Sequence, residues 1–154
     1  MNIAFVFPGQ GSQSVGMMSD LYEKFEIVRD TFGEASQALG KDLWALVSQG
    51  PEDELNQTHN TQPAMLVSGV ACWRAWQEQG GVNASFLAGH SLGEYSALTC
   101  AGVFDLADAV KLVARRGELM QSAVPAGVGA MAAILGLDDD AVREVCTHSA
   151  AGQV

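Results

Sequence analysis

The chain has 154 residues, of which 48% are hydrophobic and 17% charged, a composition typical of a globular domain with an apolar core. A formal net charge of −10 and a pI near 4.5 argue against non-specific binding to nucleic acid or to an anionic membrane surface. No apolar run approaches the roughly 18 residues that cross a bilayer, and no signal-peptide pattern precedes the first predicted strand, so we expect a cytoplasmic protein.

The three cysteines are odd in number and widely spaced, and none forms a C-x-x-C pair or a ligand-like pair with a histidine. Neither a disulfide framework nor a zinc site is indicated, and we expect reduced thiols and no bound metal or other cofactor. These residues are Cys72, Cys100 and Cys146.

The first half of the chain combines one predicted strand with several helices. An apolar run over 3–7 predicts a buried strand, and a glycine-rich loop follows it. Apolar residues at steps of three or four predict one amphipathic helix over 21–39. A short helix is expected at 42–47, and an acidic first turn at 51–54 indicates another. The segment 63–79 is apolar on most faces and predicts a core helix that begins at its proline.

The second half continues the alternation. We predict a strand over 85–89, a helix over 91–100, a long helix over 105–121, a small-residue strand over 129–137 and a helix over 138–149. This order indicates an α/β protein with a largely parallel sheet. Because two or three strands make a poor sheet for so many apolar helices, we expect the chain to be a truncated piece of a longer protein.

The stretch LAGHSLGEY contains a G-x-S-x-G pentapeptide centred on Ser91. A nucleophile elbow is a sharp turn between a strand and a helix, and small residues such as Gly89 and Gly93 let the two backbones approach closely. Ser91 would then lie at the positive end of the helix, where backbone N–H groups stabilise developing negative charge. The alternative is that Ser91 is only a helix N-cap.

No histidine of the chain is a convincing base for this serine. His90 adjoins Ser91, but residues that flank an elbow point their side chains apart. We expect His59 in a polar loop and His148 late in an exposed helix, both as surface residues.

The loop after the first strand carries Gly9, Gly11 and Gly16, a spacing that fits neither G-x-G-x-x-G nor a P-loop. The loop is either a plain turn or a row of exposed backbone N–H groups at the carboxyl end of a parallel strand, where α/β sheets bind ligands. In the second case it could supply an oxyanion donor beside the serine.

Two neighbouring arginines on the helix 105–121 have different settings. Arg115 falls on the polar face with helical partners three and four residues away, as a solvated residue. Arg116 falls at the border of the buried stripe, between Val113 and Met120, and a guanidinium there needs an anion. That anion is either a structural carboxylate or a substrate carboxylate held bidentately.

Several motifs in a consistent order carry a resemblance over the whole chain: GQGSQ after the first strand, TQPA at 61–64, GHSLGEYSAL at 89–98, and RRGELMQ with AVPAGVGAMAAI at 115–134. Together they resemble the bacterial malonyl-CoA:acyl carrier protein transacylases. Because Met1 leads directly into the first strand, the free-standing type of enzyme is expected.

The resemblance implies an α/β-hydrolase-like large subdomain with a parallel sheet, of which 1–123 would be the N-terminal part. A ferredoxin-like small subdomain would be inserted into it, and 124–154 would be its incomplete start. The implied reaction transfers a malonyl group from malonyl-CoA to the phosphopantetheine thiol of acyl carrier protein through a malonyl-serine ester.

Residue by residue, Ser91 matches the family's nucleophile, and the backbone N–H groups of Gln10 and Leu92 match its oxyanion hole. Arg116 matches the arginine that pairs with the malonyl carboxylate, and Gln62 matches an active-site glutamine.

One part of the family's pattern is absent from this sequence. The family's catalytic histidine lies in the C-terminal half of the full-length enzymes, so we expect this chain to need the C-terminal half of the same enzyme as a partner. The other expected partners are malonyl-CoA and acyl carrier protein. We expect the 154-residue chain alone neither to transfer malonate nor to fold stably. The alternatives are a serine hydrolase, such as a thioesterase or esterase, and an inactive fragment that needs its C-terminal half.

Overall fold

The computed structural model describes residues 2–123 and 134–149, and its contacts divide the chain into two units, Met1–Ala123 and Val124–Val154. The elements of the first unit are β1 (Ala4–Phe7), α1 (Ser19–Lys24), α2 (Glu26–Leu39), α3 (Leu43–Gln49), α4 (Glu52–Leu55), α5 (Thr58–Glu78), β2 (Phe86–Gly89), α6 (Leu92–Cys100) and α7 (Leu106–Ala123).

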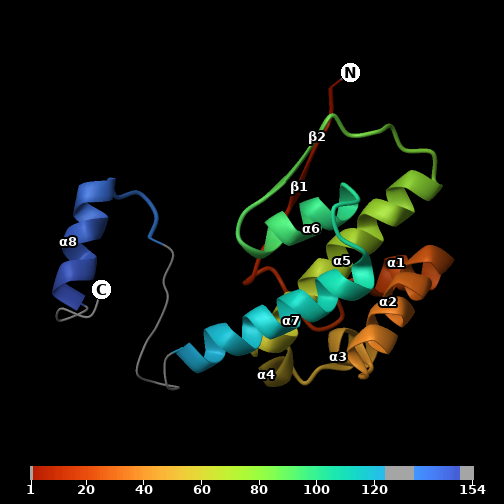
Figure 1. The fold of residues 1–154 in the computed structure, drawn as a ribbon, viewed down its shortest axis with the longest axis horizontal. Coiled ribbons are helices and arrows are strands. Elements are labelled where there is room, and N and C mark those ends of the chain that lie inside the picture. The colour runs from red at the N-terminus through yellow and green to blue at the C-terminus, as the bar shows by residue number, and fades with distance from the viewer. Residues whose placement is uncertain (1, 124–133, 150–154) are drawn as a thin grey trace. The chain divides into compact units, whose positions relative to one another are not determined.

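The two strands form a small parallel sheet, in which Ala4 is opposite Phe86 and Phe7 is opposite Gly89 (Figure 1). The prediction of an α/β protein with parallel strands is confirmed in this coarse form. Parallel strands end at the same edge of a sheet, so the loop after β1 and the turn after β2 meet there. This edge carries the G-x-S-x-G stretch.

Helix α5 is the centre of the first unit and packs against α2, α6 and α7 (Figure 1). Its residues are buried on nearly every side, as predicted for a core helix. The buried apolar cluster around it includes Phe32, Leu43, Leu55, Leu66, Leu92, Val110 and Val113.

The predicted start of that helix was wrong. Helix α5 begins at Thr58 after the N-cap Gln57, so Pro63 lies inside it and His59 is helical rather than in a loop. A proline removes only one donor, and near a helix N-terminus several backbone N–H groups have no helical acceptor in any case. The first turn of α5 therefore extends the helix toward the polar loop after β1.

The predicted single helix over 21–39 is two helices that meet at Phe25, whose backbone is extended (φ −119°, ψ 123°). Arg29 explains the break, because its Nη1 donates to the carbonyl oxygens of Tyr22 at 2.6 Å and Glu23 at 3.1 Å. These carbonyls at the end of α1 have no helical donor once the helix stops, and the guanidinium satisfies them.

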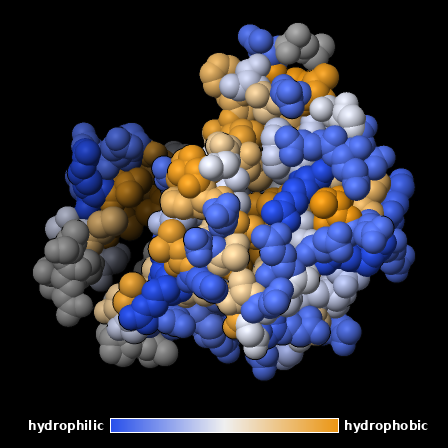
Figure 2. Space-filling model, turned by 45° about the vertical axis from the view of Figure 1, so that its right-hand side comes forward, coloured by the Kyte–Doolittle hydropathy of each residue, from blue (hydrophilic) through white to orange (hydrophobic). Residues whose placement is uncertain are grey.

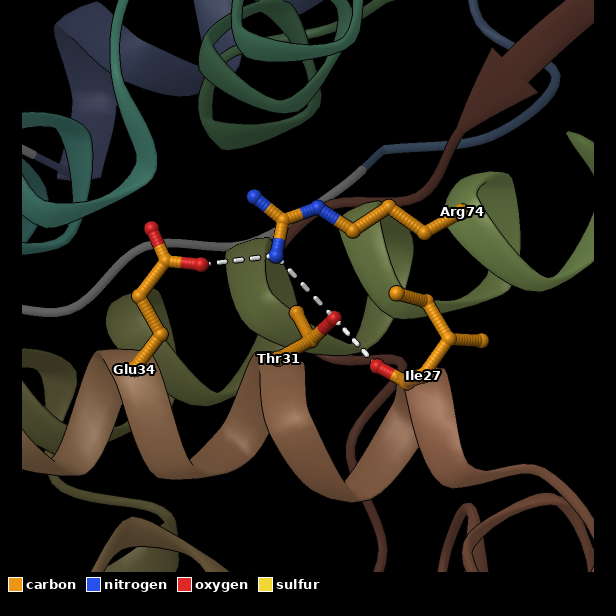
Figure 3. Close-up of polar contacts among 4 residues, drawn as sticks. All are labelled: Ile27, Thr31, Glu34 and Arg74. Carbon is orange, nitrogen blue, oxygen red and sulfur yellow. Dashed lines mark hydrogen bonds and ion pairs between the residues drawn. The ribbon is translucent and has the colours of Figure 1, made fainter. Parts of the chain in front are cut away.

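A polar contact joins α2 to α5 across the surface of the core (Figure 3). Nη1 of Arg74 donates to Glu34 Oε2 at 2.7 Å and to Thr31 Oγ1 at 3.2 Å, and Thr31 Oγ1 in turn donates to the Ile27 carbonyl at 2.6 Å. The apolar cluster stabilises the packing of α2 against α5, and this directional polar contact helps to set how the two helices are aligned.

The described part of the second unit is mainly α8 (Asp139–Ser149), where Asp138 Oδ1 accepts from the N–H of Ala141 at 2.9 Å as an N-cap. Most of the predicted strand 129–137 lies outside the described residues. The described part of that segment, 134–137, forms no strand. Gly136 has φ +81°, which an extended strand does not allow.

Within the described ranges, none of the helices combines the length and the apolar character that crossing a bilayer requires.

Candidate active site

Ser91 occupies the turn between β2 and α6 with φ 54° and ψ −110°. A positive φ is rare for a residue with a side chain, and such strain collects at functional sites. Among the described residues the Ser91 side chain makes no cap hydrogen bond to α6, so the alternative that it serves only as an N-cap lacks its defining contact. The conformation is that of a nucleophile elbow.

The glycines on either side allow this turn. A Cβ on Gly93 would overlap the carbonyl oxygen of Phe7, and a Cβ on Gly89 would overlap the backbone of Gly93. The start of α6 therefore lies directly on the end of β1. Gly9, in the loop after β1, lies close to the elbow as well, since a Cβ there would be 3.4 Å from the carbonyl oxygen of His90.

The loop after β1 is tied to the start of α5 by amide side chains. The N–H of Gly11, whose φ is +102°, donates to Gln13 Oε1 at 2.8 Å, and Gln13 Nε2 donates to Asn56 Oδ1 at 2.7 Å. Gln10 Nε2 donates to Thr58 Oγ1 at 3.4 Å. Because Gly9 packs against the elbow, these contacts hold Gln10 next to the turn that carries Ser91.

The guanidinium of Arg116 reaches from α7 to the serine. Its Nη2 donates to Ser91 Oγ at 2.9 Å and its Nη1 donates to Gln62 Oε1 at 2.8 Å, while its Cζ lies 5.6 Å from the centre of the Tyr95 ring. Among the described residues no carboxylate lies within ion-pair distance of Arg116. Its charge is therefore held by two neutral oxygens and an aromatic face.

Gln62 is the buried centre of this cluster, with 1% of its surface exposed. Its Oε1 accepts from Arg116, and its Nε2 donates to Met120 Sδ at 3.1 Å. Gln62, Ser91 and Arg116 are all predicted as site residues from the sequence, and hydrogen bonds join the three in the structure. Met120 is not predicted as a polar contact, although it follows Arg116 by four residues and so shares its helix face.

Arg115 behaves as the spacing predicts. Its Nη1 donates to Glu118 Oε2 at 2.8 Å, three residues along the helix, and both side chains are exposed. A pair of this kind contributes only a few tenths of a kcal/mol. The two neighbouring arginines therefore differ as expected, one solvated and one turned into the site.

None of the three histidines supplies a base in the described residues, where no hydrogen bond links Ser91 to a histidine. The backbone of His59 packs against Gly117 of α7, where a Cβ would lie 2.5 Å from His59 Cα. His148 is exposed on α8 and His90 is exposed on the elbow.

Burial shifts the pKa of three titratable groups among the described residues, Lys41, Cys72 and Cys100, and none of them hydrogen-bonds to Ser91 there. Burial raises the pKa of the Cys100 thiol to about 12, and burial lowers the pKa of Lys41, whose Nζ donates to Asn60 Oδ1 at 2.6 Å. In the described part of the chain no group of three or more His, Cys, Asp or Glu side chains could hold a metal ion.

Residues 4–151 match the family described as the acyl transferase domain. The chain belongs to this family. It is 62% identical over 151 residues to the malonyl CoA-acyl carrier protein transacylase of Escherichia coli K12, covering 98% of this chain and 49% of that protein. It is 50% identical over 143 residues to the enzyme of the same name from Bacillus subtilis 168, covering 93% and 45%. The resemblance found in the sequence is confirmed.

Solved structures of the family agree with the fold. The transacylase from Coxiella burnetii matches with a TM-score of 0.95 and 52% identity, covering 100% of this chain and 49% of that one. A malonyl-transacylase solved with the acyl-carrier protein of a type II polyketide synthase matches with a TM-score of 0.93 and 58% identity, covering 100% and 50%. The chain spans about half the length of the relatives that it matches.

Proposed function

We propose that this chain supplies the nucleophile and the acyl-carboxylate site of a transacylase that moves a malonyl group from malonyl-CoA to acyl carrier protein in fatty acid synthesis. Ser91 Oγ attacks the thioester carbonyl, its proton passes to a base, and the C–S bond breaks to release the CoA thiol. The phosphopantetheine thiol then attacks the malonyl-serine ester, and Ser91 Oγ takes back a proton. The general base comes from outside this chain.

One observation carries the proposal: the Arg116 guanidinium contacts the nucleophile and, in the described residues, lacks a carboxylate partner. In a malonyl ester on Ser91, only the ester carbonyl carbon and one CH₂ group separate the ester oxygen from the free carboxylate. The carboxylate can therefore reach the Arg116 guanidinium, which already contacts Ser91 Oγ. The bidentate geometry of arginine suits such a carboxylate.

The same arrangement gives selectivity. An acetyl group has no carboxylate, so it would leave the Arg116 charge uncompensated in a site closed by substrate. Removing one partner of a desolvated charge pair costs on the order of 2–5 kcal/mol, which favours malonyl over acetyl groups.

The oxyanion of the tetrahedral intermediate is expected to lie between the backbone N–H groups of Gln10 and Leu92. Leu92 is the first residue of α6, so its N–H is free of helical acceptors and lies at the positive end of the helix. The contacts of Gln13 and Thr58 hold the loop that carries Gln10. Donors that are fixed before the reaction need no reorganisation when charge develops.

We further infer that 1–123 is part of an α/β-hydrolase-like subdomain and 124–154 the start of a ferredoxin-like one, both completed by the other half of the enzyme. Val6 is 76% and Phe86 is 66% exposed, and orange surface gathers at the top of Figure 2, the end where Figure 1 draws the strands. A groove of about 330 Å³ beside β1 is almost entirely apolar in its lining, which includes Phe5, Met65 and Trp73. Exposed apolar strands of this kind call for further packing partners.

The test uses the full chain fused at its C-terminal end to the remaining half of the Escherichia coli relative. The fusion should transfer malonyl groups from malonyl-CoA to acyl carrier protein, mass spectrometry should find a malonyl ester on Ser91, and Ser91→Ala should abolish both. Arg116→Ala should weaken malonyl transfer by at least about 30-fold while relatively sparing acetyl transfer. Equal loss with both acyl groups, or faster hydrolysis of neutral esters than malonyl transfer, would instead support a serine hydrolase.

A further inference from the structure

We propose that Met120 is a positioning residue for this site: its thioether sulfur accepts a hydrogen bond from Gln62 Nε2 and so turns the Gln62 carbonyl oxygen toward Arg116. This inference rests on the proposed function for its catalytic consequence. The contacts themselves form one chain, from Met120 Sδ through the Gln62 amide and the Arg116 guanidinium to Ser91 Oγ, with donor–acceptor distances of 3.1, 2.8 and 2.9 Å.

The orientation of the Gln62 amide is decided by what lies at its two ends. If the amide were flipped, its NH₂ group would face Arg116, and two donors without a shared acceptor repel each other. The oxygen therefore faces the guanidinium, and the NH₂ group must face Met120. At 1% exposure Gln62 has almost no access to water, so another acceptor for this NH₂ group has to come from the protein.

Met120 is well placed to supply that acceptor. Arg116 and Met120 lie four residues apart on one face of α7, so the helix presents a donor to one end of the amide and an acceptor to the other. A thioether is a weak acceptor, but it carries no charge. It satisfies the amide without adding a carboxylate that would compete for Arg116.

The consequence is a guanidinium whose position is set before substrate binds. With the Gln62 amide fixed, Arg116 is directed toward Ser91 Oγ, where the malonyl carboxylate is expected to arrive. Without the sulfur, the amide can rotate, and part of the binding free energy of the carboxylate is spent on ordering the side chains. Met120 should therefore affect the KM for malonyl-CoA more than kcat.

The experiment compares three variants of the fusion enzyme. Met120→Leu keeps an apolar side chain of similar volume and removes the acceptor, and Met120→Gln restores an acceptor at similar length. Met65→Leu makes the same methionine-to-leucine change at a buried position of the core, away from the Arg116 contacts. We expect Met120→Leu to raise the KM for malonyl-CoA roughly three- to tenfold with kcat within about twofold. Met120→Gln should recover most of the loss, and Met65→Leu should leave KM unchanged.

A packing role predicts the opposite ranking, because leucine would be tolerated and a polar glutamine would not. Equal KM values for Met120→Leu and the unchanged enzyme, or a Met120→Gln variant worse than Met120→Leu, would overturn the proposal. A second readout does not depend on activity: in NMR spectra of the isotope-labelled fusion enzyme, the Gln62 side-chain NH₂ signal should shift in Met120→Leu and return in Met120→Gln. If the unchanged fusion fails to transfer malonate, the proposed function fails, and this signal still decides the role of Met120.

Discussion

Replacing Gln62 by Glu should fill the proposed acyl-carboxylate site with a carboxylate of the protein itself. Gln62 and Glu have nearly the same shape, so the new side chain would place a charged oxygen where Oε1 now accepts from Arg116 at 2.8 Å. A charge-assisted hydrogen bond of this kind is about twice as strong as a neutral one. The malonyl carboxylate would then meet an arginine whose charge is already neutralised.

The size of the effect follows from the setting of Arg116. Loss of a partner for a desolvated charge costs on the order of 2–5 kcal/mol, and Arg116 is only half-buried before substrate binds, which favours the lower end. About 2 kcal/mol corresponds to a decrease of roughly 30-fold in kcat/KM for malonyl-CoA. Transfer of an acetyl group should not decrease, because that group makes no use of the positive charge.

The assay measures kcat/KM for malonyl-CoA and acetyl-CoA with the fusion enzyme and acyl carrier protein. Gln62→Met is the matched control, since it removes the oxygen without adding a charge and should lower the malonyl value by less than about tenfold. Thermal unfolding of both variants checks that the fold is retained. If Gln62→Glu leaves the ratio of malonyl to acetyl transfer within about threefold of the unchanged enzyme, an electrostatic role for Arg116 in binding the acyl group is refuted.

Four further predictions concern packing, thiol chemistry and an ion pair in the fusion enzyme. Gly117→Ala should lower the free energy of unfolding in urea by roughly 1–3 kcal/mol, because the new Cβ would lie 2.5 Å from His59 Cα. An unchanged free energy of unfolding would contradict the close packing of α7 against α5 at this position. Iodoacetamide at pH 8 should alkylate the exposed Cys146 at least about 100-fold faster than Cys100, as followed by mass spectrometry, and equal rates would contradict the burial of Cys100. Because the pKa of Cys100 is raised from 9.0 to about 12 in the folded chain, the unfolded thiol ionises first, and the free energy of unfolding should decrease as pH rises from 9 toward 12. Arg74→Met should cost less than about 1 kcal/mol of unfolding free energy, since its ion pair is partly exposed, and a loss above about 2 kcal/mol would show a larger role.

Local features were predictable where one stretch of sequence decides the structure. The elbow at Ser91 follows from an apolar strand, two small residues and the start of a helix, which follow one another directly in the sequence. The exposed pairing of Arg115 follows from helical spacing alone. In both cases the interacting atoms are close in sequence, so periodicity and backbone sterics are sufficient.

Element boundaries were less predictable, because a side chain elsewhere sets them. The apolar spacing continues without interruption through Phe25, yet Arg29 satisfies the carbonyls at the end of α1 and lets the helix break there. The proline at position 63 predicts a helix start, although the contacts of α5 with α7 and α4 favour a helix that begins five residues earlier. Tertiary contacts override local preference at both positions.

The contact between Gln62 and Arg116 joins residues 54 apart, and no spacing rule connects them. It depends on how closely α5 and α7 approach, and Gly117 sets that approach, because its missing side chain lets the backbone of α7 lie against His59. Gly117 adjoins Arg116, and His59 precedes Gln62 by three residues, so this close approach of the two helices lies beside the site. A Cβ at position 117 would therefore move Arg116 away from both Gln62 and Ser91. The glycine that allows α5 and α7 to pack also determines whether the Arg116 guanidinium can reach Ser91. Under the proposed function, Gly117→Ala should therefore reduce the preference for malonyl over acetyl groups as well as the stability of the fold.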